Sequence, residues 1–276
     1  MKFIPVAFIV LSFAAIFGFT VPQKKGDYAA PHTAKAPIID GAGTDACWAK
    51  APWQPINEKW LGEPYKPADF TGRYKAVWDS SFVYILAEIT DDTLADTHKD
   101  GLVKYWDDDC LEVFFDEDRS KGIHTYSYNA FAYHLSLANH CVDYGLDSAA
   151  HYYDSHAYTR RVTKGKNSVW EVRFSIHPDT YKPAKGKEKE SSPLKLRAGK
   201  KLGFAIAYCD NDRSKERENF IGNVPVAGTD KNKGYIDAGI FGELTLVPPG
   251  NASTATNKAK PLPAQQKTAA PAKHTK

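Results

Sequence analysis

The segment from Tyr105 to Asp116 combines an indole with several carboxylates, which are side chains suited to binding sugars. It reads Tyr-Trp-Asp-Asp-Asp-Cys-Leu-Glu-Val-Phe-Phe-Asp. The apolar face of a sugar ring stacks on an aromatic side chain, while a carboxylate accepts hydrogen bonds from the hydroxyl groups. Trp106 and Glu112 are therefore candidate sugar-binding residues. The alternative is that Trp106 is an ordinary rim or core residue and that the acids lie on a solvated loop.

The two halves of this segment have opposite strand propensities. A Trp followed by three Asp is unfavourable in a strand, whereas the run from Leu111 to Phe115 is typical of one. Side chains alternate between the two faces of a strand, so the apolar positions mark the core face and Glu112 points the other way. The pattern predicts that Glu112 lies on the outer face of a strand, next to a loop that carries Trp106.

Period-2 runs of β-branched and aromatic residues recur between about residues 37 and 247, whereas helical periodicity is almost absent. This pattern predicts an all-β fold, an antiparallel β-sandwich of the jelly-roll kind. A turn is expected at Trp78–Phe82. The predicted strands are Tyr74–Trp78, Phe82–Ile89, Leu111–Phe115, Val169–Ile176, Leu202–Tyr208 and Ile240–Val247, with weaker signals at Thr125–Leu137 and Tyr158–Thr163.

The two ends of the chain differ in composition from its middle. Lys2 precedes an apolar run from Phe3 to Val21, which predicts a signal peptide over residues 1–21, with an uncleaved membrane anchor as the alternative. Either reading places the bulk of the protein outside the cytoplasm: secreted, periplasmic or at the cell surface. Residues 22–36 are a polar linker, and residues 248–276 are a Pro/Ala/Lys-rich tail without aromatics, expected to be disordered. One domain of residues 37–247 remains.

Charge and cysteine spacing exclude several classes of function. The tail holds five lysines and no acid, and residues 1–36 hold four lysines and one aspartate, so residues 37–247 carry a net charge of −5 within a chain total of +3. An acidic domain is poorly matched to a phosphate backbone, which argues against nucleic-acid binding. The cysteines at 47, 110, 141 and 209 form no C-x-x-C motif, so a zinc ribbon or a thioredoxin-like site is not expected.

The chain resembles the family 9 carbohydrate-binding modules, which are β-sandwiches related to DOMON-type domains. The resemblance covers nearly all of residues 37–247 and is carried by an ordered set of short motifs. These include Ile39-Asp40-Gly41, Ala76-Val77-Trp78-Asp79, Trp106-x-x-Asp109-x-x-Glu112-Val113-Phe114-Phe115-Asp116, Trp170-Glu171-Val172 and Phe241-Gly242-x-Leu244-x-Leu246. The resemblance implies a non-catalytic protein that clamps a mono- or oligosaccharide between two aromatic side chains; with the predicted signal peptide, an exported protein acting in polysaccharide breakdown or uptake is expected.

Carried over residue by residue, the resemblance implies four carbohydrate-binding residues. Trp106 and Tyr235 would form the clamp, and Glu112 and Asn129 would bind the hydroxyl groups. Ser127 stands where the family pattern often has an Arg, which weakens the assignment of a cellulose- or xylan-derived ligand. Trp48, Trp78 and Trp170 are expected to pack in the core.

The resemblance also implies structural calcium. Asp116 and Asp118 space oxygen atoms as calcium loops do, and they are the candidate metal ligands. The segment departs from an EF-hand, however, because Gly occupies position 7 of the loop and Ser127 occupies position 12. An ordinary Asp-rich turn is the alternative.

Two other functions remain open from the sequence. A glycoside hydrolase would use Glu112 with one of Asp107–Asp109 or with Glu171 as its pair of carboxylates. Asp109 and Glu112 are three apart on a strand, however, and so face opposite sides. A haem-binding electron carrier of the DOMON type is the remaining alternative, because bis-His ligation of haem needs no Met.

Overall fold

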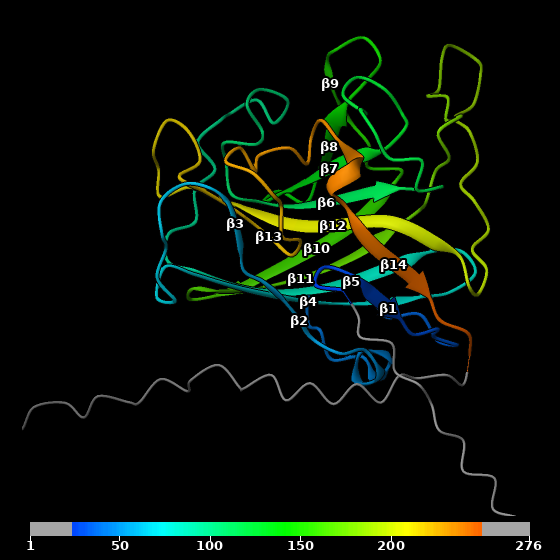
Figure 1. Ribbon diagram of the computed structural model, residues 1–276, viewed down its shortest axis with the longest axis horizontal. Helices are drawn as coiled ribbons and strands as arrows, with labels where there is room; N and C mark the ends of the chain where they lie inside the picture. Colours follow the sequence, from blue (N-terminus) through cyan, green and yellow to red (C-terminus); the bar gives the residue numbers. More distant parts are fainter. Residues whose placement is uncertain (1–23, 250–276) are drawn as a thin grey trace, which may run out of the picture.

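Two β-sheets pack face to face in the computed structural model, which describes residues 24–249 (Figure 1). Strands make up nearly all of the regular structure in this range, and η1 (Ala46–Lys50) and η2 (Ala238–Ile240) are short 3₁₀ turns. The predicted all-β sandwich is therefore confirmed. Within residues 24–249, no helix has the length and apolar character needed to cross a membrane. The predicted signal peptide (1–21) lies outside the described residues, as does the predicted tail beyond residue 249.

The smaller sheet contains five strands in the order β10-β11-β5-β4-β2, and all its neighbours pair antiparallel. Asp79 closes the β4–β5 hairpin, because its Oδ1 accepts hydrogen bonds from the backbone N–H groups of Ser81 and Phe82 at 2.8 and 2.9 Å. The turn predicted at this position is confirmed. The strands are β2 (Gln54–Ile56), β4 (Phe70–Trp78), β5 (Val83–Asp91), β10 (Ala157–Lys164) and β11 (Asn167–Phe174).

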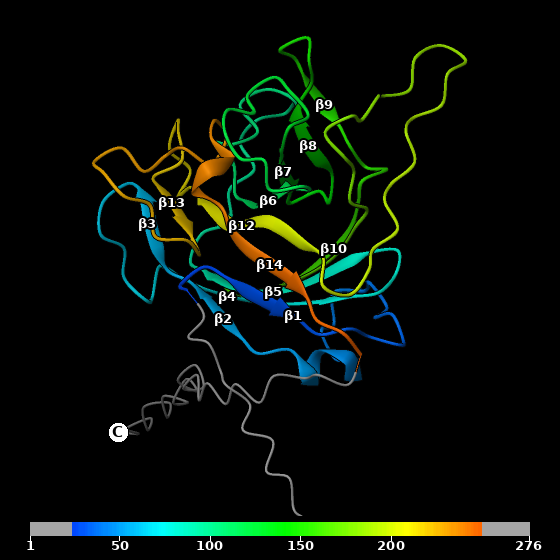
Figure 2. The same ribbon diagram turned by 45° about the vertical axis from the view of Figure 1, so that its right-hand side comes forward.

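The larger sheet contains nine strands, and Figure 2 shows β14, β12 and β6 next to one another in it. Its main path is β1-β14-β12-β6-β7-β8-β9, with β13 and β3 continuing from one half of β12. β1 and β14 pair in parallel, and the other neighbours pair antiparallel. The strands are β1 (Tyr28–Ala30), β3 (Glu58–Leu61), β6 (Cys110–Asp116), β7 (Phe131–Ser136), β8 (Cys141–Tyr144), β9 (Ala150–Tyr152), β12 (Lys201–Asp210), β13 (Asn219–Gly222) and β14 (Gly242–Leu246).

β6 divides the core from the outer face of the larger sheet. Leu111, Val113 and Phe115 belong to the main core between the sheets. Phe114 points to the opposite face, where Trp60 and other side chains cover it. Glu112 shares that opposite face, as the alternation predicts. Trp48, Trp78 and Trp170 are buried, which confirms their predicted packing role.

Two predictions about local structure were wrong. Residues 28–30 fall in the predicted linker but form β1, because Tyr28 and Ala30 bury their side chains in the core. Three residues are too few to show an alternating pattern. The strand predicted over residues 125–137 begins only at Phe131, since the preceding chain turns back with Tyr126 at a φ of 56° and the Ser127 N–H bonded to the His124 carbonyl.

Three buried carboxyl groups meet at one end of the sandwich. They belong to Asp91 at the end of β5, Asp109 just before β6 and Asp210 at the end of β12, and their oxygen atoms lie within 4.8 Å of one another. Burial, followed by repulsion from Asp91, raises the pKa of Asp109 to about 9 and that of Asp210 to about 8. One oxygen of Asp210, Oδ2, is buried without a hydrogen-bond partner. Folding therefore favours the protonated form of these groups.

The substitution Asp210→Asn tests this effect. A carboxyl group whose pKa rises on folding contributes stability below its unfolded pKa, and that contribution is lost as the pH rises toward the folded pKa. For Asp210 the window runs from pH 3.8 to about 8. We expect the stability of the parent, relative to Asp210→Asn, to fall by up to about 1.4 kcal/mol per pH unit across this window. Denaturant unfolding at pH 5 and pH 8, with a chelator present, measures the difference. Parallel pH dependences would show that ionisation of Asp210 is not linked to folding.

Candidate functional site

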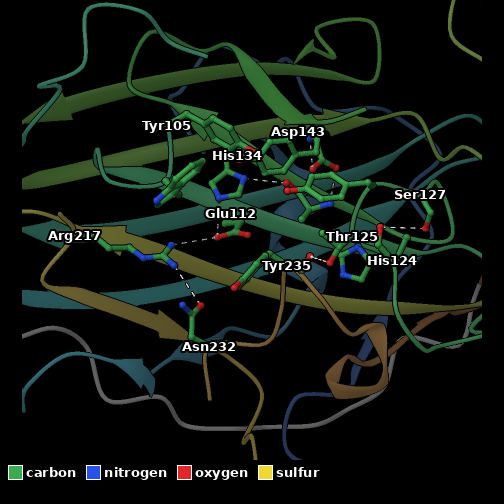
Figure 3. Close-up of a pocket in the computed structure, with 15 residues that line it drawn as sticks. Tyr105, Glu112, His124, Thr125, Ser127, His134, Asp143, Arg217, Asn232 and Tyr235 are labelled. Atoms are coloured by element: carbon green, nitrogen blue, oxygen red, sulfur yellow. Dashed lines mark hydrogen bonds and ion pairs between the residues drawn. The ribbon is translucent and has the colours of Figure 1, made fainter. Parts of the chain in front are cut away.

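A cavity of about 250 Å³ opens on the face of the larger sheet that points away from the core (Figure 3). Its floor comes from β6 and β7, and its walls come from the end of β8 and from loops that precede or follow the strands. The volume lies below the range of about 300–1,000 Å³ typical of sites for drug-sized ligands, so it suits one or two small rings. It is lined by Tyr105, Trp106, Glu112, His124, Thr125, Tyr126, Ser127, Ala130, Ala132, His134, Asp143, Tyr144, Arg217, Asn232 and Tyr235.

The structure brings together three of the four carbohydrate-binding residues predicted from the sequence. Trp106, Glu112 and Tyr235 all line this cavity, although they come from the loop before β6, from β6 itself and from the loop before η2. Asn129 does not line it. Its Nδ2 donates to the Lys121 carbonyl at 2.7 Å, and its Oδ1 accepts from the Ser120 hydroxyl at 2.9 Å, so the amide is bound within the β6–β7 connection.

Glu112 is held at the floor by His134 and Arg217. His134 lies directly opposite it on β7, and the distance from Nε2 of His134 to Oε2 of Glu112 is 3.1 Å. Burial lowers the pKa of His134, but the Glu112 carboxylate outweighs this and raises the pKa above its ordinary value. Nη1 of Arg217 lies 4.0 Å from the same Oε2. These contacts orient the carboxylate toward the cavity and balance its charge.

Tyrosines that the sequence analysis did not identify form much of the cavity wall. The Tyr105 ring meets the Trp106 ring edge to face, with centroids 5.1 Å apart. Tyr144 lies 6.3 Å from Trp106 and 5.2 Å from Tyr126. The sequence offered one signal for Tyr105 as a cavity residue, because Tyr105 directly precedes the candidate residue Trp106. Tyr126 and Tyr144 come from a turn and from a strand end, where no periodic pattern marks them.

Two loops that are far apart in the sequence join to form the side of the cavity that carries Tyr235. The His124 N–H donates to the Ile236 carbonyl at 2.8 Å, and Nε2 of His124 lies 2.7 Å from the Gly234 carbonyl. The Thr125 hydroxyl donates to the Tyr235 carbonyl at 3.2 Å. Backbone bonds on both sides of Tyr235 therefore fix its position, while 42% of its surface remains exposed. An exposed aromatic ring held in one place can act as a stacking surface.

Asp143 is the second carboxylate of the cavity. Its Oδ2 accepts from the Ala132 N–H and its Oδ1 accepts from the Tyr144 N–H, at 2.8 and 2.7 Å. Burial raises the pKa of Asp143 to about 6. Both oxygens are engaged by the backbone, so this group helps to fix β7 against β8.

Comparison with known proteins identifies the family. Residues 39–248 match the family model described as carbohydrate family 9 binding domain-like. The chain belongs to this carbohydrate-binding family. A search of curated protein sequences found no match.

Solved structures of family 9 carbohydrate-binding modules share the fold of this family 9 domain. A module from Caldicellulosiruptor kristjanssonii in complex with cellotriose is 17% identical with a TM-score of 0.60, covering 87% of this chain and 100% of its own. A module from the same organism in complex with glucose is 19% identical with a TM-score of 0.59, covering 82% and 99%. A putative carbohydrate-binding protein from Bacteroides uniformis is 10% identical with a TM-score of 0.54, covering 80% and 99%.

The carboxylates proposed as partners of Glu112 in a glycoside hydrolase do not line the cavity of this family 9 domain. Oδ1 of Asp108 accepts from the Thr97 N–H at 2.6 Å, and Oδ1 of Asp109 accepts from the Asn211 N–H at 2.7 Å. Glu171 lies on the other sheet, where the Trp48 indole donates to Oε1 at 3.0 Å. Each of these acids accepts a hydrogen bond from a neighbouring segment of the chain, so its position indicates a structural role.

The candidate calcium ligands lie in the turn after β6. Asp116 accepts hydrogen bonds from the N–H groups of Arg119 and Lys121 at 2.7 and 2.8 Å, and Asp118 accepts from the Ser120 N–H at 2.9 Å. These are the contacts of an Asp-rich turn, the alternative drawn from the sequence. Calcium binding by Asp116 and Asp118 stays a prediction.

Asn129→Ala separates a turn-stabilising role from a sugar-binding role. Loss of its two hydrogen bonds should lower stability by about 1 kcal/mol, and affinity for a sugar should stay at the parent value. Denaturant unfolding and calorimetric titration with cellotriose measure the two effects. A loss of affinity without a loss of stability would instead make Asn129 a sugar contact, as the family resemblance implies.

Proposed function

We propose that this protein is an exported, non-catalytic binder of mono- or oligosaccharides, and that the sugar occupies the cavity above β6 and β7. The observation that carries the proposal is the meeting of Trp106, Glu112 and Tyr235 at one cavity from three separate parts of the chain. Membership of a carbohydrate-binding family and the fold shared with modules that bind glucose and cellotriose support it.

The chemistry of the cavity matches that of a pyranose. Trp106 and Tyr235 offer aromatic faces to the apolar C–H groups of the ring, and Tyr144 adds a third aromatic surface. Glu112 offers a charged acceptor and Arg217 a charged donor to the hydroxyl groups. Because these groups are held by neighbouring strands and loops, the site is largely formed before binding, which favours affinity.

Arg217 supplies a guanidinium group that the sequence comparison had missed. The position at which the family pattern often carries an Arg is Ser127, which lines the cavity in this chain. Arg217 reaches the cavity from the loop before β13, and its Nη2 donates to Oδ1 of Asn232 at 3.3 Å. We propose that Arg217 and Asn232 bind hydroxyl groups together and that the ligand is a cellulose- or xylan-derived sugar.

Removing either clamp ring should weaken binding. Trp106→Ala and Tyr235→Ala are each expected to reduce the affinity for cellotriose by about 1–3 kcal/mol, since each removes a stacking surface. Isothermal titration calorimetry with glucose, cellotriose and a xylan-derived oligosaccharide measures this loss and identifies the preferred sugar.

Tyr158→Ala is the matched control. Tyr158 is 41% exposed, almost the same as Tyr235 at 42%, but it lies on β10 in the other sheet. Its removal should leave sugar affinity at the parent value. If Trp106→Ala, Tyr235→Ala and Tyr158→Ala all bind every tested glycan as well as the parent, the sugar does not occupy this cavity.

The proposal also implies that the protein has no glycosidase activity and that it lies outside the cytoplasm. Incubation with cellulose- and xylan-derived oligosaccharides should release no reducing sugar beyond a blank. Mass spectrometry of the protein from the natural host should find a mature chain that lacks residues 1–21. If the protein releases reducing sugar and Glu112→Gln abolishes this activity, the glycoside hydrolase is favoured instead. If the chain keeps residues 1–21 and is found in the cytosol, the protein is not exported.

A further inference from the structure

Two cysteines and a histidine meet beneath the floor of the cavity. The Sγ atoms of Cys110 and Cys209 and a ring nitrogen of His134 lie within 4.8 Å of one another, and all three side chains are buried. Oε2 of Glu112 completes the group, at 3.1 Å from Nε2 of His134 and 3.8 Å from Sγ of Cys209. The group therefore presents two sulfur atoms and one imidazole nitrogen to a common point, with the Glu112 carboxylate beside His134 and Cys209.

The register of three neighbouring strands produces this arrangement. Cys209 on β12 lies directly opposite Cys110 on β6, and His134 on β7 lies directly opposite Glu112 on β6. Cys110 and Glu112 are two residues apart, so both point to the outer face of the sheet. The four side chains thus sit at the corners of a small patch on rigid backbone, whereas a loop site would be less precisely held.

Two separations within the group are close to those of a tetrahedral metal site. Zinc binds sulfur at about 2.3 Å and nitrogen or oxygen at about 2.0–2.2 Å, which separates ligand atoms by roughly 3.3–3.8 Å. The separations of 3.1 and 3.8 Å from Glu112 to His134 and Cys209 lie close to this range.

The orientation of His134 is that of a metal ligand. Its Nδ1 lies 3.0 Å from the Ala132 carbonyl oxygen, which can only accept, so Nδ1 carries a proton. Nε2 is then the atom turned toward the two thiols and the carboxylate. A histidine that binds a metal through one nitrogen commonly donates its other N–H to a backbone carbonyl in this way.

Arg217 gives the site a balanced charge. Its Nη1 donates to Sγ of Cys209 at 3.0 Å and lies 4.0 Å from Oε2 of Glu112. Two thiolates and one carboxylate carry three negative charges, which a divalent cation and one guanidinium neutralise. Since a buried site tolerates little net charge, this balance favours occupation by a divalent ion.

We infer that Cys110, Cys209, His134 and Glu112 form a binding site for a zinc ion beneath the proposed sugar site. Two sulfur ligands and an imidazole are the donor set that zinc prefers over magnesium or calcium. Glu112 and His134 line the cavity, so an ion can reach the ligands from it. The zinc site shares Glu112 and His134 with the proposed sugar site, whereas the two cysteines do not line the cavity and belong to the zinc site alone.

Cobalt substitution tests the site in the full chain. The reduced, chelator-treated protein should take up one equivalent of Co²⁺, with the thiolate-to-cobalt absorption and the intense visible bands of a tetrahedral site, and Zn²⁺ should displace it. Zn²⁺ should also raise the melting temperature of the parent protein, since an ion that binds only the folded state stabilises it. The melting experiment needs no variant, so it stands even where a substitution impairs folding.

The double variant Cys110→Ser/Cys209→Ser should lose the thiolate-to-cobalt absorption and the zinc-dependent rise in melting temperature. Cys141→Ser is the matched control, because Cys141 is equally buried but lies on β8 outside the group. Arg217→Gln should weaken zinc affinity roughly 10–100-fold, as loss of a group that bonds to a ligand does.

Three results would overturn the inference. The reduced parent could take up no Co²⁺ or Zn²⁺, or the double variant could give the spectrum of the parent. Peptide mapping of the protein as isolated could also find a disulfide between Cys110 and Cys209, which would remove both sulfur ligands. Each result leaves the sugar titrations with Trp106→Ala and Tyr235→Ala unaffected, so failure of the zinc site is distinguishable from failure of the sugar site.

Discussion

The pleat of β6 is the constraint on which the rest of the structure depends. Its odd-numbered residues from Leu111 to Phe115 fill the space between the sheets, so the intervening side chains must face outward. One register therefore sets both the core and the floor of the cavity. A slip of one residue would send Glu112 into the core and an apolar side chain into the cavity. The burial of the apolar set thereby fixes the position of the functional carboxylate.

Buried carboxyl groups are arranged differently at the floor of the cavity and at the end of the sandwich. At the floor of the cavity, Glu112 has His134 and Arg217 within 4.0 Å, so opposite charges compensate each other. At the end of the sandwich, Asp91, Asp109 and Asp210 lie within 4.8 Å of one another and have neutral hydrogen-bond donors such as the Tyr208 hydroxyl and the Asn211 N–H, and their pKa values rise. The first arrangement sets a carboxylate beside a cation at a cavity, whereas the second favours protonated carboxyl groups. This contrast is a physical reason to place function at the first site.

The cavity combines a rigid floor with walls made of loops. Strand pairing holds Glu112 and His134, while Tyr235 depends on hydrogen bonds between its loop and residues 124 and 125. The contacts thus have different origins: strand pairing sets the Glu112–His134 pair, and loops supply Trp106, Tyr235 and Arg217. Loops tolerate sequence change more readily than paired strands do. Ligand choice can therefore vary within the family while the fold stays the same.

The sequence by itself determined the all-β fold, most of the strands, the outward direction of Glu112 and the packing of Trp48, Trp78 and Trp170. Alternation is a local property of the chain, so a linear reading detects it, and the family resemblance supplied the packing of the tryptophans. Short segments escaped the pattern, which is why β1 was taken for linker, and the sugar-binding role that the resemblance implies for Asn129 stays a prediction. Only the tertiary structure decided that Arg217 and Tyr144 join Trp106, and that Cys110 lies opposite Cys209. Strand register and loop contacts set these distances between residues far apart in the chain, and no local pattern records them.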